Sequence, residues 1–234
     1  MVIAHPQRFK NRRAAGKLLA RRLGAYAGRH DVIVLALPRG GVPVGLAIAE
    51  KLGLELDVLL VRKLGFPGHE ELAMGAVASG GLRVLQADLL AAFHVAPELI
   101  EAATRDELHE IARREQRYRS RRPAPLLRGR VVILADDGVA TGATMRAAVQ
   151  LVRQAGPARV VMAVPVCARA AHAQLSALVD ECICIKTPEP FRAVGAWYDN
   201  FEQIGDEEVD AMLTEIWRPA RRARRAVEQA ASKH

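Results

Sequence analysis

The sequence predicts an α/β protein with an open, mostly parallel sheet flanked by helices. Short apolar runs rich in valine, isoleucine and leucine recur along the 234 residues, and stretches of helical character separate them. Such runs are typical of strands buried on both faces, and their alternation with helices predicts parallel strands. Half of the residues are hydrophobic but only 4% are aromatic, which indicates an aliphatic core. This length is sufficient for one large domain, which we place at residues 1–217.

The individual elements follow in order. Residues 8–28 form an amphipathic pattern with a basic outer face, typical of a helix packed at the edge of the sheet. A small hairpin is expected around Gly80 and Gly81, and residues 86–122 form a helical insertion. Its long second helix has early acids and late arginines, as the helix dipole favours, and we expect it to be solvated or oligomer-facing. The expected strands are 31–37, 56–61, 131–135, 159–166 and 181–186. The other expected helices are 42–52, 97–122, 145–153 and 168–178.

The most informative stretch is residues 130–145, in which a buried strand ends at Asp136 and Asp137. The small, hydroxyl-bearing loop that follows leads into a helix, whose unpaired N–H groups and positive dipole end bind phosphate readily. The hydroxyls of Thr141 and Thr144 add donors, and Gly142 lets the backbone approach an anion closely. Two carboxylates beside a phosphate need another task, such as accepting hydrogen bonds from a sugar diol or lying near Mg²⁺.

Three further segments carry candidate residues. The first two strands end at basic turns, which suit an anion; these turns are Arg39, Gly40, Gly41 and Arg62, Lys63. Residues 64–75 hold three glycines and a proline, and we expect a mobile loop with acid or base groups at His69, Glu70 and Glu71. Residues 187–204 hold four of the ten aromatic residues, including Phe191, Trp197 and Tyr198. These rings could bind a flat ligand or simply cover an end of the sheet.

The strand, the Asp-Asp pair and the glycine–threonine loop resemble the phosphoribosyl-pyrophosphate (PRPP) motif of type I phosphoribosyltransferases. The resemblance implies that Asp136 and Asp137 hold the ribose hydroxyls and that Mg²⁺ reaches them only through PRPP or water. The implied 5′-phosphate ligands are Gly138, Ala140, Thr141, Gly142, Ala143 and Thr144. The implied pyrophosphate ligands are Arg39, Gly40, Gly41, Arg62 and Lys63. By analogy, the peptide bond between Pro38 and Arg39 is expected to be cis.

The same resemblance assigns the remaining parts. Residues 64–75 match the flap that closes over PRPP, and residues 187–204 match the small C-terminal hood in which an aromatic ring stacks on the base. The implied catalytic residues are Asp136, Asp137, Glu70 and Glu71. Hypoxanthine-guanine members carry an Asp where this chain has Ala140, so acid–base help must come from Glu70, Glu71, His69 or water. Lys186 and Arg192 lie near the hood but match no purine-reading lysine, and a purine-like nitrogenous base remains the expected acceptor.

Composition bounds the other possibilities. The net charge is +8, but five of these positive charges lie in residues 218–234, which we interpret as a basic tail. Nucleic acid is therefore not the expected partner, and the alternative is a PRPP- or nucleotide-sensing regulator that does bind nucleic acid. A third possibility is an oligomer-forming protein with a vestigial site. We also expect a cytoplasmic homo-oligomer without a signal peptide, membrane span, disulfide framework or zinc site.

Overall fold

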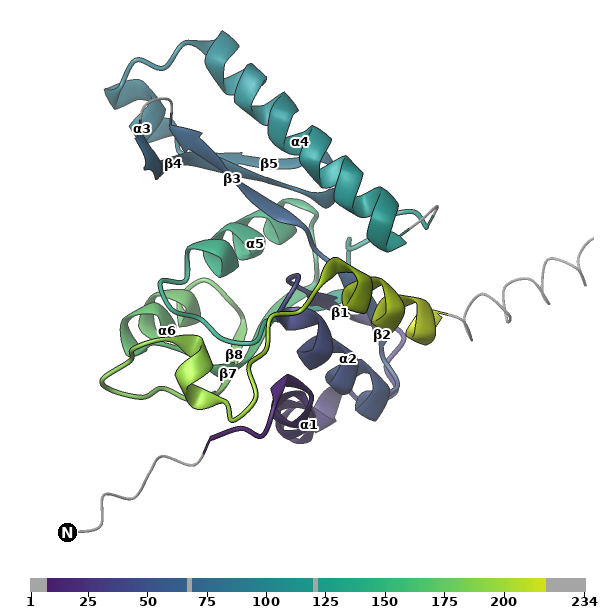
Figure 1. Ribbon diagram of the computed structural model, residues 1–234. Coiled ribbons are helices and arrows are strands. Elements are labelled where there is room, and N and C mark those ends of the chain that lie inside the picture. Colours follow the sequence, from purple (N-terminus) through teal and green to yellow (C-terminus); the bar gives the residue numbers. More distant parts are fainter. Residues whose placement is uncertain (1–7, 67–68, 120–121, 218–234) are drawn as a thin grey trace, which may run out of the picture.

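The computed structural model describes residues 8–66, 69–119 and 122–217. Its main sheet has five parallel strands in the order β2-β1-β6-β7-β8, which confirms the predicted open parallel sheet (Figure 1). The strands are β1 (Val32–Ala36), β2 (Glu55–Val58), β6 (Val131–Ala135), β7 (Arg159–Val166) and β8 (Glu181–Lys186).

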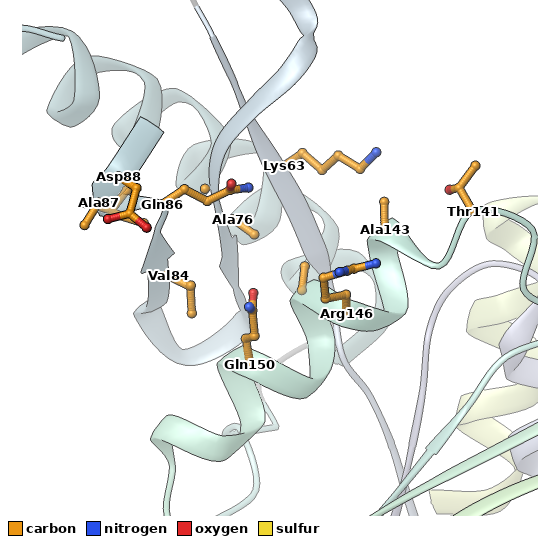
Figure 2. A pocket seen from close by; sticks show the side chains of 13 residues that line it. Lys63, Ala76, Val84, Gln86, Ala87, Asp88, Thr141, Ala143, Arg146 and Gln150 are labelled. Atoms are coloured by element: carbon orange, nitrogen blue, oxygen red, sulfur yellow. The ribbon is translucent and has the colours of Figure 1, made fainter. Parts of the chain in front are cut away.

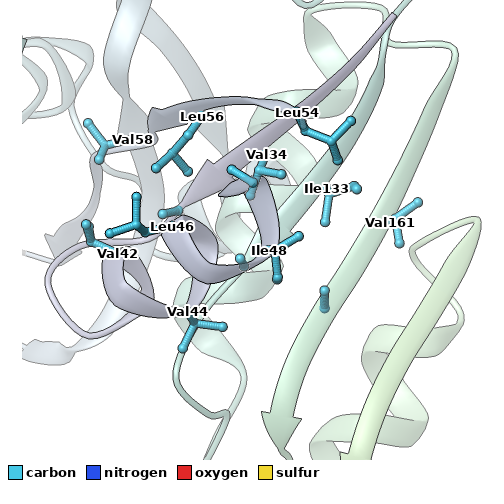
Figure 3. Packing of buried hydrophobic residues seen from close by; sticks show 14 of the residues in the cluster. Val34, Val42, Val44, Leu46, Ile48, Leu54, Leu56, Val58, Ile133 and Val161 are labelled. Carbon is cyan, nitrogen blue, oxygen red and sulfur yellow. The ribbon is translucent and has the colours of Figure 1, made fainter. Parts of the chain in front are cut away.

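Helices cover both faces of this sheet. Alternate residues of β6 show the division. Ile133 packs with Val34 and Ile48 on one side (Figure 3), and Leu134 packs with Val149 on the other. The first face carries α1 (Arg12–Arg22), α2 (Gly41–Leu52) and a helix at 206–217 that sequence reasoning did not predict. The second face carries α5 (Ala143–Gln154) and α6 (Arg169–Ser176).

A smaller unit lies beyond α5. The antiparallel strands β3 (Val61–Phe66), β4 (His69–Ala78) and β5 (Leu82–Leu85) form a second sheet. This sheet lies between α5 and α4 (Pro97–Arg119), and the short α3 (Ala87–Ala92) precedes α4 (Figure 1). Three single-turn 3₁₀ helices complete the described elements: η1 (Gly24–Tyr26), η2 (Ser79–Gly81) and η3 (Val194–Trp197).

A buried ion pair ties α4 to the edge of the main sheet. Arg119 lies beside Asp57 of β2 with an Nε to Oδ1 distance of 2.9 Å, and its Nη2 donates to the Val58 carbonyl oxygen at 2.6 Å. Both side chains are almost fully buried. Burial nevertheless raises the pKa of Asp57, so the pair is needed to keep this carboxyl charged.

Two sequence predictions were wrong in this region. The strand expected at 56–61 ends at Val58, and Val61 begins β3 in the other sheet. Residues 64–75, expected as a loop, belong largely to β3 and β4, and Leu64 and Met74 are buried in the core that also contains Ile111 of α4. Gly65 lies where the pairing of β3 with β4 is irregular. Residues 67 and 68 lie outside the described residues, as does the predicted tail at 218–234.

The N-terminal helix approaches α2 unusually closely. A Cβ atom at Gly16 would lie 2.6 Å from the carbonyl oxygen of Val44 and 2.8 Å from Cβ of Ala47, so only glycine fits this helix crossing. Asn11 caps α1 by accepting a hydrogen bond from the Ala14 N–H group at 2.8 Å. The crossing and the cap fix the first turn of α1, where Arg12 lies, next to the carboxyl ends of the strands.

Candidate functional site

The Asp-Asp pair and the Arg-Gly-Gly turn meet at the carboxyl edge of the main sheet. A Cβ atom at Gly40 would lie 2.0 Å from Oδ2 of Asp137, and one at Gly41 would lie 2.6 Å from the Ala135 carbonyl oxygen. The two segments are thus in contact only because these positions lack side chains. The peptide bond between Pro38 and Arg39 is cis, as expected. Residues about one hundred positions apart therefore form one continuous surface.

Asp136 and Asp137 lie in an environment that disfavours the charged form of both carboxyls. Burial raises the pKa of both carboxyls, and the charge of Asp137 raises the pKa of Asp136 further. Oδ1 of Asp136 accepts a hydrogen bond from the Asp137 N–H group at 2.8 Å, which favours its charged form only in part. Keeping both groups ionised therefore costs free energy, as is common where carboxylates are gathered for binding.

Arg12 offsets part of this cost, and sequence reasoning missed it. Its Nε lies 2.7 Å from Oδ2 of Asp137, and its Nη1 donates to the Glu202 carbonyl oxygen at 2.8 Å. The guanidinium also lies 3.7 Å from the centre of the Phe201 ring, a cation–π contact. In the sequence, Arg12 was one of several arginines on the basic face of a helix, and no local signal distinguished it.

The loop after the acids has the geometry of an anion site. Gly142 adopts a left-handed conformation (φ 78°) at the start of α5. The first N–H groups of α5, at Ala143, Thr144 and Met145, have no backbone acceptor among the described residues. Thr141 and Thr144 are exposed beside them. Gly138 allows the loop to pack closely against the hood segment, because a Cβ at Gly138 would lie 2.5 Å from Val194.

A cavity of about 710 Å³ opens between α5 and the small sheet. Thr141 and Ala143 lie at its rim, and Lys63 and Arg146 contribute its positive charge (Figure 2). Lys63 makes no ion pair with any described residue. Arg62 lines a separate narrow cavity with Pro38 and Thr144, and its Nε lies 2.5 Å from Oε2 of Glu107. Neighbouring strand residues face opposite ways, so the predicted basic pair is divided between two surfaces. The complete lining is Lys63, Gly75, Ala76, Val84, Leu85, Gln86, Ala87, Asp88, Thr141, Ala143, Arg146, Ala147 and Gln150.

A second cavity of about 530 Å³ lies beside the acid pair and the Arg-Gly-Gly turn. Arg39 lines it and is held by Asp206, with 2.8 Å between Nε and Oδ1. Asp206 also accepts a hydrogen bond from the Tyr118 hydroxyl of α4, and this bond helps to lower the pKa of Asp206. The complete lining is Arg12, Pro38, Arg39, Gly40, Arg114, Asp137, Phe201, Gln203 and Ile204.

The three predicted hood residues differ in how far they are buried. Tyr198 is buried between Phe9 and Phe201, and its hydroxyl donates to the Asp137 carbonyl oxygen at 2.5 Å. Its ring therefore supports the acid pair from behind and is not open to a ligand. Trp197 and Phe191 are partly exposed and pack on the same aromatic cluster. None of these three residues lines either cavity.

Other predicted residues lie outside the described geometry. The backbone of His69, Glu70 and Glu71 is in β4, but the side chains of residues 66–73 are not described. In the described ranges, no group of three or more His, Cys, Asp or Glu residues is arranged to hold a metal ion. Within the same ranges, no helix has the length and apolar character needed to cross a membrane.

Comparison with known proteins identifies the relatives of this chain. A family model described as a phosphoribosyl transferase domain matches residues 7–199. Two Mycobacterium tuberculosis proteins, from strains CDC 1551 / Oshkosh and H37Rv, are 45% identical over 205 residues and are provisionally named phosphoribosyl transferases. These matches cover 88% of this chain but 46% of each relative, so the chain spans about half their length. The crystal structure of TT1426 from Thermus thermophilus is 46% identical, with a TM-score of 0.80, and the match covers 89% of this chain and 98% of that one.

Proposed function

The chain belongs to the phosphoribosyl transferase domain family, and we propose that it transfers phosphoribose from PRPP to a nitrogenous base and releases pyrophosphate. The observation that carries this proposal is the contact between Gly40 and Asp137, where a Cβ would lie 2.0 Å from the carboxylate. It joins a basic turn to an acid pair that is followed directly by an anion-binding helix start. PRPP has the three matching parts, a pyrophosphate, a ribose diol and a 5′-phosphate, in this order.

In this proposal each part of PRPP has its own ligands. The 5′-phosphate binds at the unpaired N–H groups that begin α5, with the hydroxyls of Thr141 and Thr144. The ribose hydroxyls donate to Asp136 and Asp137, since ionised carboxylates only accept hydrogen bonds. The pyrophosphate binds at the turn formed by residues 39–41. Lys63, across the larger cavity, adds positive charge near Thr141.

The chemistry follows from this placement. The bond between ribose C1 and the pyrophosphate oxygen breaks, its electron pair leaves with pyrophosphate, and a nitrogen lone pair of the base forms the new bond to C1. Fixed cations around the pyrophosphate stabilise the charge that develops there, which is usually a large part of catalysis. Acid–base help from His69, Glu70 or Glu71 remains part of the proposal and awaits a test. Phe191 and Trp197 remain proposed contacts of a purine-like base.

The residues present fit a magnesium ion that arrives with the substrate. Mg²⁺ in phosphate-handling sites is usually held by one or two carboxylates together with substrate phosphates and water. The described residues offer two acids here and no larger ligand cluster, and Asp137 is already paired with Arg12. When bound, the ion would neutralise pyrophosphate charge. Asp136 and Asp137 would meet it only through PRPP or water, while their own task is to hold the ribose.

The experiment measures pyrophosphate release from PRPP and Mg²⁺ while purine and pyrimidine bases are added one at a time. Release with one base supports the transferase and identifies its acceptor. The Asp136→Asn, Asp137→Asn double variant is expected to lose PRPP affinity in calorimetry while circular dichroism shows an intact fold. Unchanged PRPP affinity in this folded variant would refute the site. PRPP binding without release for any base would instead favour the PRPP-sensing regulator.

A further inference from the structure

The second cavity contains three arginines from three separate elements. Arg39 comes from the turn after β1, Arg12 from the first turn of α1, and Arg114 from the middle of α4. The motif of the family accounts for Arg39 alone. Asp137 is the one acid among the described residues that line the cavity, and Asp206 and Glu110 pair with Arg39 and Arg114 from outside the lining. Such a concentration of guanidinium groups suits a polyanion.

Each of the three guanidinium groups retains hydrogen-bond donors for a ligand. Arg114 uses Nε to contact Glu110 at 2.8 Å, and Arg12 uses Nε and Nη1 for Asp137 and Glu202. Arg39 contacts Asp206 through Nε and the Ile204 carbonyl oxygen through Nη1. Among the described residues, no hydrogen bond is made by Nη2 of Arg12 or Arg39 or by either terminal nitrogen of Arg114.

Arg12 is held in place before any ligand arrives. Its side chain is 11% exposed and Asp137 is 14% exposed, so the ion pair is shielded from water and its geometry is well defined. The Phe201 ring supports the flat face of the guanidinium, and the Gly16 crossing fixes the helix that carries it. Arg114 is more exposed, but Glu110 orients it and it also lines the narrow cavity between Pro38 and Thr144.

We propose that Arg12 and Arg114 complete the pyrophosphate subsite with Arg39, and that Arg12 also positions Asp137 toward the ribose. This inference rests on the proposed function, which it deepens by adding two residues from other elements to the predicted pyrophosphate ligands. The predicted Arg62 pairs with Glu107 and lines the adjacent narrow cavity with Arg114, but it does not line the second cavity. Arg12 then belongs to two neighbouring subsites, because it holds the ribose acid with Nε and offers Nη2 to the leaving group.

The test compares Arg12→Gln and Arg114→Gln with matched controls on the same helices. Arg13→Gln removes an exposed arginine of α1 that pairs with Glu50, and Arg105→Gln removes an exposed arginine of α4 that lines neither cavity. Calorimetry with Mg²⁺ measures three probes for each protein: PRPP, inorganic pyrophosphate and ribose 5-phosphate. The first two contain the group that the arginines are proposed to bind, and the third contains only the diol and the 5′-phosphate.

The expected result is a selective loss. Arg114→Gln should weaken PRPP and pyrophosphate roughly ten- to hundredfold, as loss of a charge-assisted hydrogen bond does, and should change ribose 5-phosphate by no more than about twofold. Arg12→Gln should weaken PRPP and pyrophosphate to the same extent and ribose 5-phosphate by a smaller factor, because Arg12 also positions Asp137 toward the ribose. Arg12→Lys, which keeps the charge but not the planar fork, should recover part of the loss. The two controls should match the wild type.

The possible failures are distinguishable. If the wild type binds PRPP but both variants bind it as tightly as the controls, this inference is wrong and the proposed function stands. If Arg114→Gln weakens all three probes equally, or if Arg12→Gln weakens ribose 5-phosphate as much as pyrophosphate, the arginines only maintain the fold of the site, and the inference is also wrong. If the wild type binds none of the probes, the proposed function and this inference fall together.

Discussion

Replacing Gly40 with alanine tests the contact that assembles the site. The backbone there has φ −59° and ψ −32°, which any residue adopts, so the substitution brings no conformational strain. The new Cβ, however, would lie 2.0 Å from Oδ2 and 2.5 Å from Cγ of Asp137. The carboxyl would have to retreat by at least about 1 Å to restore ordinary packing. Arg12 occupies its other side at 2.7 Å, so the ion pair would be compressed or broken.

The expected cost is about 1–3 kcal/mol in the free energy of unfolding, the usual range for forcing an extra methyl group into a packed site. PRPP affinity should fall at least about tenfold, because the displaced acid no longer faces the ribose. Urea denaturation and calorimetry measure the two effects. Gly24→Ala is the matched control, since its Cβ would have no neighbour within 4 Å and its stability should change by less than about 0.5 kcal/mol. Wild-type PRPP affinity in Gly40→Ala would refute the reasoning.

Three further predictions concern stability and positioning. Asp136→Asn should be more stable than the wild type at pH 7. The pKa of Asp136 is raised in the folded state, so the wild-type carboxyl stabilises the fold fully only below the ordinary aspartate pKa of about 4, and this stability is lost as pH rises. In denaturation curves the difference between the two proteins should therefore vanish near pH 3. Arg119→Met should cost about 3–5 kcal/mol, because the buried Asp57 would lose its hydrogen-bonded charge partner and keep only the more distant Arg122 at 3.8 Å. Thermal denaturation beside the exposed-site control Arg113→Met checks this, and equal melting temperatures would contradict it. Gly16→Ala should weaken pyrophosphate binding although Gly16 does not line the site. Its new Cβ would lie 2.6 Å from a carbonyl oxygen of α2 and would displace α1, the helix that carries Arg12. If calorimetry finds wild-type affinity, α1 does not position this arginine.

The sequence predicted the central strands well because they are buried on both faces. Val131–Ala135 and Arg159–Val166 are continuous apolar runs, and their observed bounds equal the predicted ones. The edge strand β2 was placed less well, since it alternates polar and apolar residues and its apolar continuation turns into the second sheet. Strand β3 contains Gly65 at the position where the ladder is irregular, and glycine is ordinarily a loop signal. These errors come from tertiary packing that no local pattern records.

The candidate site divides in the same way. Candidate residues that depend on local backbone geometry, such as Gly40, Asp137 and Gly142, could be proposed from the sequence because each lies in a motif of a few consecutive positions. Arg12 and Arg114 were not, because each is one arginine among several on a helix surface and only the fold selects it. Tyr198 shows the opposite error. An aromatic residue in the hood segment suggested a ring for the base, but its hydroxyl and burial give it a supporting role behind Asp137.

An ion pair inside a binding site requires a physical reason, because a ligand usually competes with it. Arg12 uses only Oδ2 of Asp137, so Oδ1 has no side-chain partner among the described residues and can accept a ribose hydroxyl while the pair persists. In the proposed site, the same guanidinium keeps Nη2 for the pyrophosphate. A ligand that carries both groups therefore satisfies both ions without separating them, whereas a diol or a pyrophosphate alone satisfies one. Selectivity for the joined molecule then follows from a cation that belongs to both subsites.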